Sequence, residues 1–205
     1  MLDKLLLNWQ PYKITENNLP AFITYGKNMG GSHLSIVLIA DLFLQGSKIL
    51  FLSAYPMARD NFLNQVGENN SKIKFVDSTE ELEEAITAQA IIIGSGNATL
   101  FLKAIEILPD LKERVVFIKN IEIFDTQVFE ACFKSEKIII SGDIDGCIFK
   151  DKIQIQQFKT LIAFNQPQAP IEVVVPKLEK WNGYLSSKDQ NGIIAVENTK
   201  REYLR

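Results

Sequence analysis

The sequence predicts a three-layer α/β fold, in which helices cover both faces of a mainly parallel central sheet. Short apolar runs alternate with helical segments over residues 21–150, which is typical of parallel sheets buried on both sides. Residues 21–56 contain a strand, a glycine-rich turn, a helix and a second strand, the size of one parallel βαβ unit. After residue 150 the apolar segments follow one another without helices between them, so we expect antiparallel strands there.

Composition is that of an ordinary globular protein. The 205 residues are 46% hydrophobic and 23% charged, with a net charge of −3, so no overall basic field favours nucleic acid. The longest apolar segment, Leu34–Leu44, contains Ser35 and Asp41 and is shorter than the roughly 18–20 residues of a membrane span. The beginning of the chain lacks the pattern of a secretory signal, and we expect a cytoplasmic protein with no membrane span.

We expect a single domain with three parts. These are an N-terminal helix or arm (1–20), an α/β core (21–150) and C-terminal antiparallel strands (151–198). In the first part, Leu2, Leu5, Leu6 and Trp9 have helical spacing before Pro11. The predicted short helix packs on the edge of its own domain or, alternatively, docks on a partner.

The core elements are predicted from apolar runs and from their stop signals. Glycines end two helices, and Ser78 or Thr79, with the glutamates that follow, marks the start of a third. The predicted strands are Ala21–Tyr25, Lys48–Ser53, Lys72–Val76, Ala90–Ile93, Arg114–Ile118 and Lys137–Ser141, followed by Lys159–Phe164, Ile171–Leu178 and Ile193–Val196. The predicted helices are Leu34–Gln45, Met57–Val66, a segment after Ser78, Ala98–Leu108 and Phe124–Lys134.

The glycine-rich turn has the spacing of a phosphate loop without its chemistry. Gly26 and Gly31 fit the pattern G-x-x-x-x-G-K-[ST], but Ser32 stands at the lysine position and His33 at the Ser/Thr position. One interpretation is a glycine turn that lets helix and strand pack closely, and the other is retained nucleotide binding. The residues of this vestigial loop are Gly26, Lys27, Gly30, Gly31, Ser32 and His33.

Residues 21–56 resemble the core of a RecA-like P-loop ATPase, most of all its KaiC-type branch. The run KILFLSAYP over 48–56 is similar to that family's second strand, except that Ala54 and Tyr55 stand where the family carries its catalytic glutamate. Lys180–Gly183 and Gly192–Ile194 resemble the family's C-terminal strands and turn. The resemblance implies a RecA-like fold and side-by-side assembly of subunits.

An ATPase also needs an acidic residue at the end of an apolar strand to hold magnesium. Of the two candidate strands, Arg114–Ile118 is followed by Lys119 and Ala90–Ile93 by Gly94, and the sequence does not decide between them. A lysine would repel the metal, since unit charges ~4 Å apart at an effective dielectric of ~20 interact by roughly 4 kcal/mol. We therefore expect no hydrolysis, no catalytic residue and no metal site; ATP binding is possible but not expected.

Other acids and the cysteines have structural interpretations. Glu122 and Asp125 are expected to be charges at a helix N-terminus. Asp143 and Asp145 lack the further ligands of a calcium loop and are expected to serve their own turn. Cysteines 132 and 147 lack metal-ligand spacing and are expected to be buried reduced thiols.

The leading hypothesis is a catalytically inactive RecA-like protein that serves as a binding or scaffolding subunit with itself or with an active ATPase. The resemblance implies a setting in DNA repair, recombination or motor assembly. One alternative is a non-hydrolysing nucleotide or anion binder that uses the loop with Lys27, and with Lys119 and His33 as possible further donors. A second is a single-strand nucleic-acid binder whose basic and aromatic tip comprises Lys177, Lys180, Trp181 and Lys188.

Overall fold

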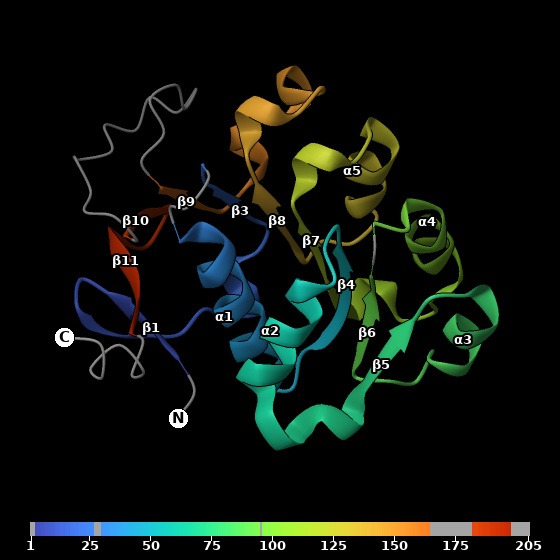
Figure 1. The fold of residues 1–205 in the computed structure, drawn as a ribbon. Coiled ribbons are helices and arrows are strands. Elements are labelled where there is room, and N and C mark those ends of the chain that lie inside the picture. Colours follow the sequence, from blue (N-terminus) through green and yellow to red (C-terminus); the bar gives the residue numbers. More distant parts are fainter. Residues whose placement is uncertain (1–2, 27–29, 95, 165–181, 198–205) are drawn as a thin grey trace.

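The computed structural model describes residues 3–26, 30–94, 96–164 and 182–197 (Figure 1). Within these ranges the helices are α1 (Gly31–Leu44), α2 (Met57–Val66), α3 (Thr79–Glu84), α4 (Ala98–Ile107) and α5 (Thr126–Cys132). The strands are β1 (Lys4–Leu7), β2 (Gln10–Tyr12), β3 (Ala21–Thr24), β4 (Lys48–Ser53), β5 (Ile73–Val76), β6 (Ala90–Ile93), β7 (Arg114–Lys119), β8 (Ile138–Gly142), β9 (Thr160–Phe164), β10 (Gly183–Ser187) and β11 (Asn191–Glu197).

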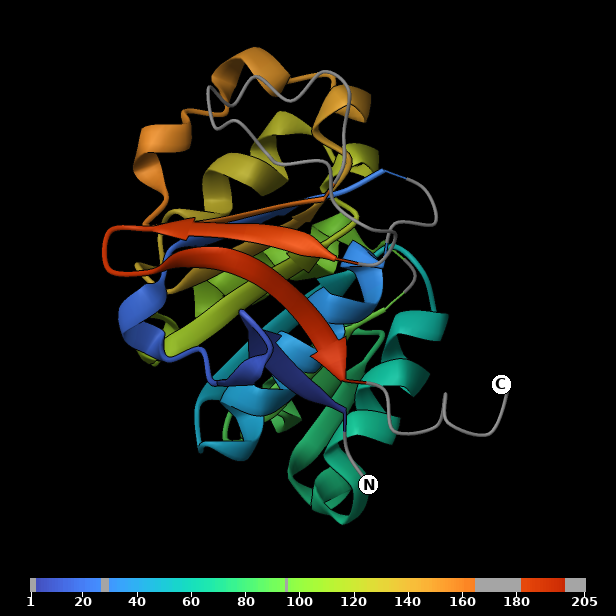
Figure 2. The same ribbon diagram turned by 90° about the vertical axis from the view of Figure 1, so that its left-hand side faces the viewer.

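The described strands form one sheet in the order β2-β1-β11-β10-β9-β3-β8-β7-β4-β6-β5. Every neighbouring pair from β9 to β5 is parallel, and every pair from β9 to β2 is antiparallel. Figure 2 looks onto the antiparallel end, where β10 and β11 lie in front. The predicted fold class, a mainly parallel sheet with antiparallel additions, is confirmed.

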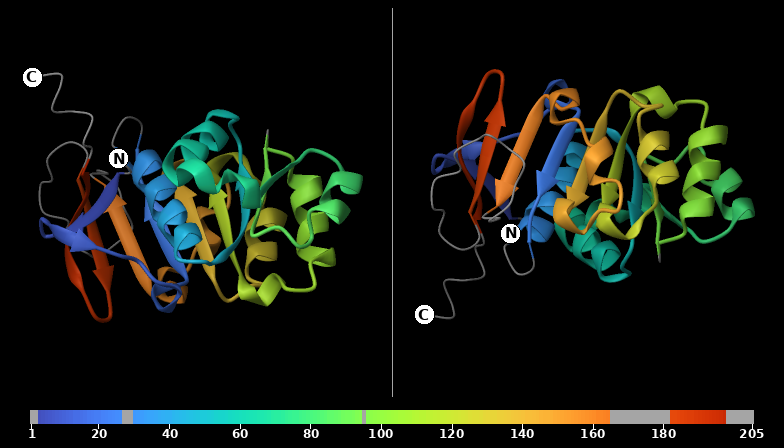
Figure 3. Two further views of the ribbon diagram at one scale, coloured as in Figure 1. Left: turned by 90° about the horizontal axis from the view of Figure 1, so that it is seen from below. Right: turned by 90° about the horizontal axis from the view of Figure 1, so that it is seen from above.

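Helices cover both faces of the parallel part (Figure 3). Helices α1 and α2 pack on one face, while α3, α4 and α5 pack on the other. Alternate residues of each strand serve the two cores: Ala21 and Ile23 of β3 join the first, and Phe22 joins the second. This arrangement gives the three layers that the sequence predicts.

Strand β3 lies between β8 and β9, in the middle of the sheet, and the chain leaves it through α1. The next strand along the chain, β4, is separated from β3 by β8 and β7, whereas β9 lies on the other side of β3. The direction in which successive strands are added to the sheet therefore reverses around β3. In open α/β sheets the crevice at such a reversal, outside the carboxyl ends of the strands, is where ligands bind. The glycine-rich turn after β3 opens at this edge.

The N-terminal helix prediction is wrong, because residues 4–12 form a hairpin. Leu7 and Gln10 pair across the two-residue turn Asn8-Trp9, where both residues have positive φ (49° and 66°). Positive φ at both positions defines the type I′ turn that suits two-residue hairpins. The hairpin is held by the pairing of β1 with β11, a long-range contact that the local leucine spacing does not encode.

Two details of the C-terminal prediction also change. Strand β9 pairs in parallel with β3 as well as antiparallel with β10, so it belongs partly to the parallel sheet. Gly183 begins β10, Gly192 is inside β11, and the turn between these strands falls at residues 188–190. The predicted strand Ile171–Leu178 lies outside the described residues.

Both cysteines are buried and free, as expected. Over the described part of the chain, no helix is long and apolar enough to cross a bilayer.

Candidate functional site at the carboxyl edge of the sheet

The glycine-rich loop joins the end of β3 to the start of α1. Gly30 is the N-cap of α1 with φ 89°, a left-handed conformation for which glycine is suited, and Gly31 is the first helical residue. The first amides of a helix point outward and favour anions. Lys27, which the sequence suggests as an anion ligand, lies outside the described residues. Gly26 is the last described residue before it.

Packing inside the protein accounts for Gly31. A Cβ on this residue would collide with the ring of Tyr25, the residue after β3. Burial raises the pKa of Tyr25 to about 12. The hydroxyls of Ser32, Ser35 and Ser141 surround its phenol, although within the described residues none completes a hydrogen bond to it. The tyrosine therefore fills the space beneath the loop.

Lys119, the last residue of β7, reaches across to the loop. Its ammonium donates to Ser32 Oγ at 2.6 Å and to Asn120 Oδ1 at 3.1 Å. The side chain is nearly inaccessible, with 4% of the residue exposed. Burial lowers the pKa of Lys119 to about 8, and the nearby carboxylate of Glu122 partly opposes that shift.

This contact decides which strand faces the loop. Strand β7 is separated from β3 only by β8, whereas β6 lies on the far side of β4. Lys119, rather than Gly94, therefore stands at the strand end nearest Ser32. A buried cation therefore lies beside the first turn of α1.

Glu122 does not act as a helix N-terminal charge, in contrast to the prediction. It lies in the short 3-10 turn Ile121–Ile123, where its carboxylate accepts from Asn120 Nδ2 at 3.2 Å and from the amide of Asp143 at 3.1 Å. A Cβ on Gly142 would collide with this carboxylate, so a glycine at that position allows the approach. Glu122 thus ties the ends of β7 and β8 together beside Lys119.

His33 makes its contact outside the loop. Its Nε2 lies 2.8 Å from the Oδ2 atom of Asp3, which also accepts from Gln65 Nε2 at 3.1 Å. The imidazole therefore joins α1 to the beginning of β1. Neither the predicted helix nor the sequence spacing indicated this partner.

The remaining acids have the predicted structural roles. Asp125 caps α5 by accepting from the amide of Val128, and Asp143 accepts from the amide of Asp145 within its own turn. Among the described residues no group of three or more His, Cys, Asp or Glu side chains is placed to hold a metal ion.

Exposed apolar side chains lie near the same edge. Tyr55 and Met57 follow β4 and are 54% and 70% exposed, and Ile123 follows β7 and is 48% exposed. Gly96 lies between the segment that follows β4 and the segment that follows β7, because a Cβ there would lie 3.8 Å from Ala54 and 3.9 Å from Ile123. We call Tyr55, Met57 and Ile123 the edge patch. Large exposed apolar groups of this kind often mark interaction surfaces.

The predicted nucleic-acid tip falls largely outside the described residues. Lys177, Lys180 and Trp181 belong to the undescribed segment, while Lys188 is exposed in the turn between β10 and β11.

The chain has the fold of P-loop NTPases. Comparison of solved structures finds the genome packaging NTPase B204 from Sulfolobus turreted icosahedral virus 2 in complex with ATP-gammaS, with a TM-score of 0.54, 14% identity, and 87% of this chain and 95% of that chain covered. The Thermomonospora curvata EccC (ATPases 2 and 3) has a TM-score of 0.58, 13% identity, and 97% and 41% coverage. The pCW3 conjugation coupling protein TcpA has a TM-score of 0.54, 11% identity, and 98% and 67% coverage.

No protein-family model and no curated protein matches the sequence. At these identities the structural likeness establishes the fold alone.

Sequence reasoning missed Tyr25 and Asp3 and misjudged Glu122. A signal for Tyr25 was its position directly before the first loop glycine, at the end of an apolar strand. Asp3 gave no local signal, because its contacts to His33 and Gln65 depend on the hairpin.

Proposed function

We propose that this protein is a P-loop-fold subunit that does not hydrolyse nucleotide and acts by binding or scaffolding. The observation that carries the proposal is the buried ammonium of Lys119, 2.6 Å from Ser32 Oγ. In an ATPase the same place holds magnesium between the loop hydroxyl and a strand-end acid. A lysine supplies neither a metal ligand nor a general base for water at neutral pH.

The neighbouring positions support this proposal. Ser32 and His33 replace the lysine and the hydroxyl of the loop, and Ala54 and Tyr55 follow β4 where the resemblance places the catalytic glutamate. Loss of one transition-state donor commonly lowers a rate by ~10²–10³, so several absences together leave no effective turnover. From the resemblance of residues 48–56, we propose that the chain is related to the KaiC-type branch of RecA-like proteins. We also propose that it works in an assembly for DNA repair, recombination or a motor.

The edge patch supports association with another protein. Its three side chains are exposed at the ends of β4 and β7, although an apolar surface is stabilised by removal from water. We propose that it contacts a second copy of the chain or an active P-loop subunit at this edge.

Phosphate release by the purified protein tests the catalytic part. We expect no magnesium-dependent release of phosphate from ATP above the background of a Ser32→Ala variant. A magnesium-dependent rate that is lost in a Gly31→Val variant, with the fold retained by circular dichroism, would overturn the proposal.

Sedimentation tests the association part. Met57→Glu should reduce self-association, or association with a candidate P-loop partner, because it places a charge in the edge patch. Trp9→Glu is the matched control, since Trp9 is also exposed (59%) but lies at the tip of the β1–β2 hairpin. Equal effects of the two substitutions would contradict a specific role for the patch.

A second candidate function is magnesium-independent anion binding. The favouring observation is that Lys119 brings a cation to the N-terminal turn of α1, where the helix dipole already favours negative charge. ATP or inorganic phosphate should then raise the melting temperature equally with magnesium or with EDTA, and Lys119→Met should abolish the rise. A rise that requires magnesium would contradict this candidate.

A further inference from the structure

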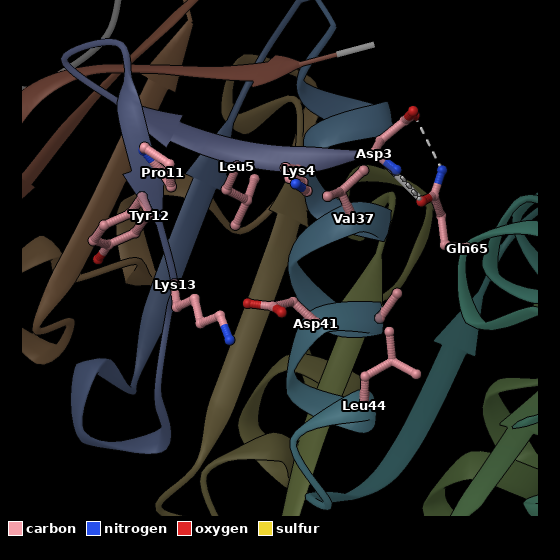
Figure 4. Close-up of a pocket in the computed structure, with 11 residues that line it drawn as sticks. Asp3, Lys4, Leu5, Pro11, Tyr12, Lys13, Val37, Asp41, Leu44 and Gln65 are labelled. Atoms are coloured by element: carbon pink, nitrogen blue, oxygen red, sulfur yellow. Dashed lines mark hydrogen bonds between the residues drawn. The ribbon is translucent and has the colours of Figure 1, made fainter. Parts of the chain in front are cut away.

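A cavity of about 340 Å³ lies between the N-terminal hairpin and α1 (Figure 4). Leu5 and Tyr12 line it from β1 and β2, and Val37 and Leu44 line it from α1. Mostly apolar walls with a few polar groups, enclosing about this volume, are typical of sites for small organic molecules.

One charged group lies within the wall formed by α1. Asp41 is the only acidic residue on this helix, and the buried positions of the helix are almost all apolar. Its side chain points into the cavity (Figure 4) and is half-buried. Burial raises the pKa of Asp41, while Lys13 and Gln45 partly oppose that shift. A carboxylate in this setting is stabilised by a cation that enters the cavity.

Asp41 retains unused acceptor capacity. Within the described residues the carboxylate of Asp41 accepts one hydrogen bond, from Gln45 Nε2 at 3.1 Å, whereas a carboxylate has about four acceptor positions. Lys13 approaches from the opposite wall, and its ammonium points toward Asp41 without coming within 4 Å, the limit of an ion pair.

The other charged groups at the cavity do not compete for this role. Asp3 is engaged by His33 and Gln65, and Lys4 is exposed at the mouth. Lys13 is also exposed, so its ammonium can return to water when another cation takes its place. The charge held among the apolar groups is therefore that of Asp41.

We propose that this cavity binds a small organic cation, a primary amine on a compact apolar or aromatic body, with its ammonium paired to Asp41. The apolar body lies against Leu5, Val37 and Leu44, which line the cavity. This site is independent of the proposed scaffold function, because none of its residues belongs to the loop or the edge patch.

Three probes of similar size and different charge test the proposal by NMR titration at pH 7: phenethylamine, 2-phenylethanol and phenylacetate. We expect phenethylamine to bind tightest and to shift the methyl signals of Val37 and Leu44. Asp41→Asn should weaken phenethylamine at least about tenfold and change 2-phenylethanol by less than about twofold, since only the charge is removed. Lys13→Gln should strengthen phenethylamine, because the competing ammonium is gone.

Asp60→Asn is the matched control: Asp60 is an exposed acid of α2 that is not among the residues lining the cavity, so its removal should leave all affinities unchanged. Circular dichroism checks that each variant is folded. Tightest binding of phenylacetate, an unchanged amine affinity in Asp41→Asn, or no shift at Val37 and Leu44 up to millimolar phenethylamine would each overturn the proposal.

Discussion

Single residues decide the chemistry at the carboxyl edge. Lys119 and Ser32 are 87 positions apart in the chain, yet their polar atoms form one of the shortest side-chain contacts in the described structure. Hydrogen bonds to Ser32 and Asn120 and the nearby charge of Glu122 partly compensate for the burial of the ammonium. The site is thus occupied by the protein's own cation.

The lowered pKa of Lys119 predicts a pH-dependent stability. Between about 8 and 10.5 the unfolded chain keeps the lysine proton while the folded chain releases it, so the free energy of unfolding rises with pH. From pH 7.5 to 9.5 this contribution should increase by about 2 kcal/mol. Urea denaturation of the wild type and of Lys119→Met across this range measures the difference; parallel curves would contradict the prediction.

A second residue-scale prediction concerns the contact between Gly31 and Tyr25. Gly31→Ala should destabilise the fold by about 1–3 kcal/mol, because the added methyl group overlaps the buried ring. Gly94→Ala is the control, since a Cβ there meets nothing within 4 Å, and it should cost less than about 0.5 kcal/mol. Chemical denaturation measures both. Tyr25→Leu should relieve the cost of Gly31→Ala, and a full cost in the double variant would exclude this mechanism.

At the scale of elements, the N-terminal hairpin has the largest consequences. It extends the sheet through β11, forms one wall of the cavity and brings Asp3 to His33. Asn8 fastens its turn, since Asn8 Oδ1 accepts from the amide of Ile193 at 3.0 Å. A side chain at Gly192 would collide with Asn8, which explains a glycine inside a strand.

A substitution in the turn of this hairpin tests whether residues 4–12 form two strands or a helix. Trp9→Gly should leave the free energy of unfolding unchanged or raise it by up to about 1 kcal/mol, because Asn-Gly is favoured in type I′ turns and the φ of residue 9 is 66°. In a helix the same substitution would cost about 1 kcal/mol. Thermal and urea unfolding distinguish the two signs. Leu5→Ala, at a buried position of β1, should be destabilising and serves as the control.

At the scale of the whole molecule, the two edges of the parallel sheet differ. The carboxyl edge carries the loop and the edge patch. At the amino edge, the fully buried Arg114 at the start of β7 connects the neighbouring chain segments. Its guanidinium donates to Asp110 Oδ1 at 2.7 Å and to the carbonyls of Ile86 at 2.8 Å and Ala88 at 3.1 Å. Segments that enter β6 and β7 are therefore held together by one side chain.

Arg114→Met should destabilise the whole domain by about 3–5 kcal/mol, because it leaves buried acceptors and the Asp110 carboxylate without their donor. Arg114→Lys should also be destabilising, since an ammonium cannot reproduce the planar set of donors. Lys48→Met is the matched control: Lys48 pairs with the same Asp110 at 2.8 Å but is exposed, so the cost should be below about 1 kcal/mol. Equal costs at the two positions, measured by urea denaturation, would contradict the assigned role of Arg114.

Much of the α/β core could be predicted from local patterns. The bounds of β4, α2 and β6 agree with the predicted segments Lys48–Ser53, Met57–Val66 and Ala90–Ile93, because burial imposes period and length on each segment independently of the rest. The sequence itself also shows that Lys119, and not an acidic residue, follows Arg114–Ile118.

Tertiary structure alone decided the contacts between distant segments. The sheet order placed Lys119 rather than Gly94 beside Ser32, and it brought Glu122 to the amide of Asp143. Pairing of β1 with β11 turned a helical leucine spacing into a hairpin and so created the cavity around Asp41. Periodicity reports only how each segment is buried, whereas which strands become neighbours depends on packing across the whole chain.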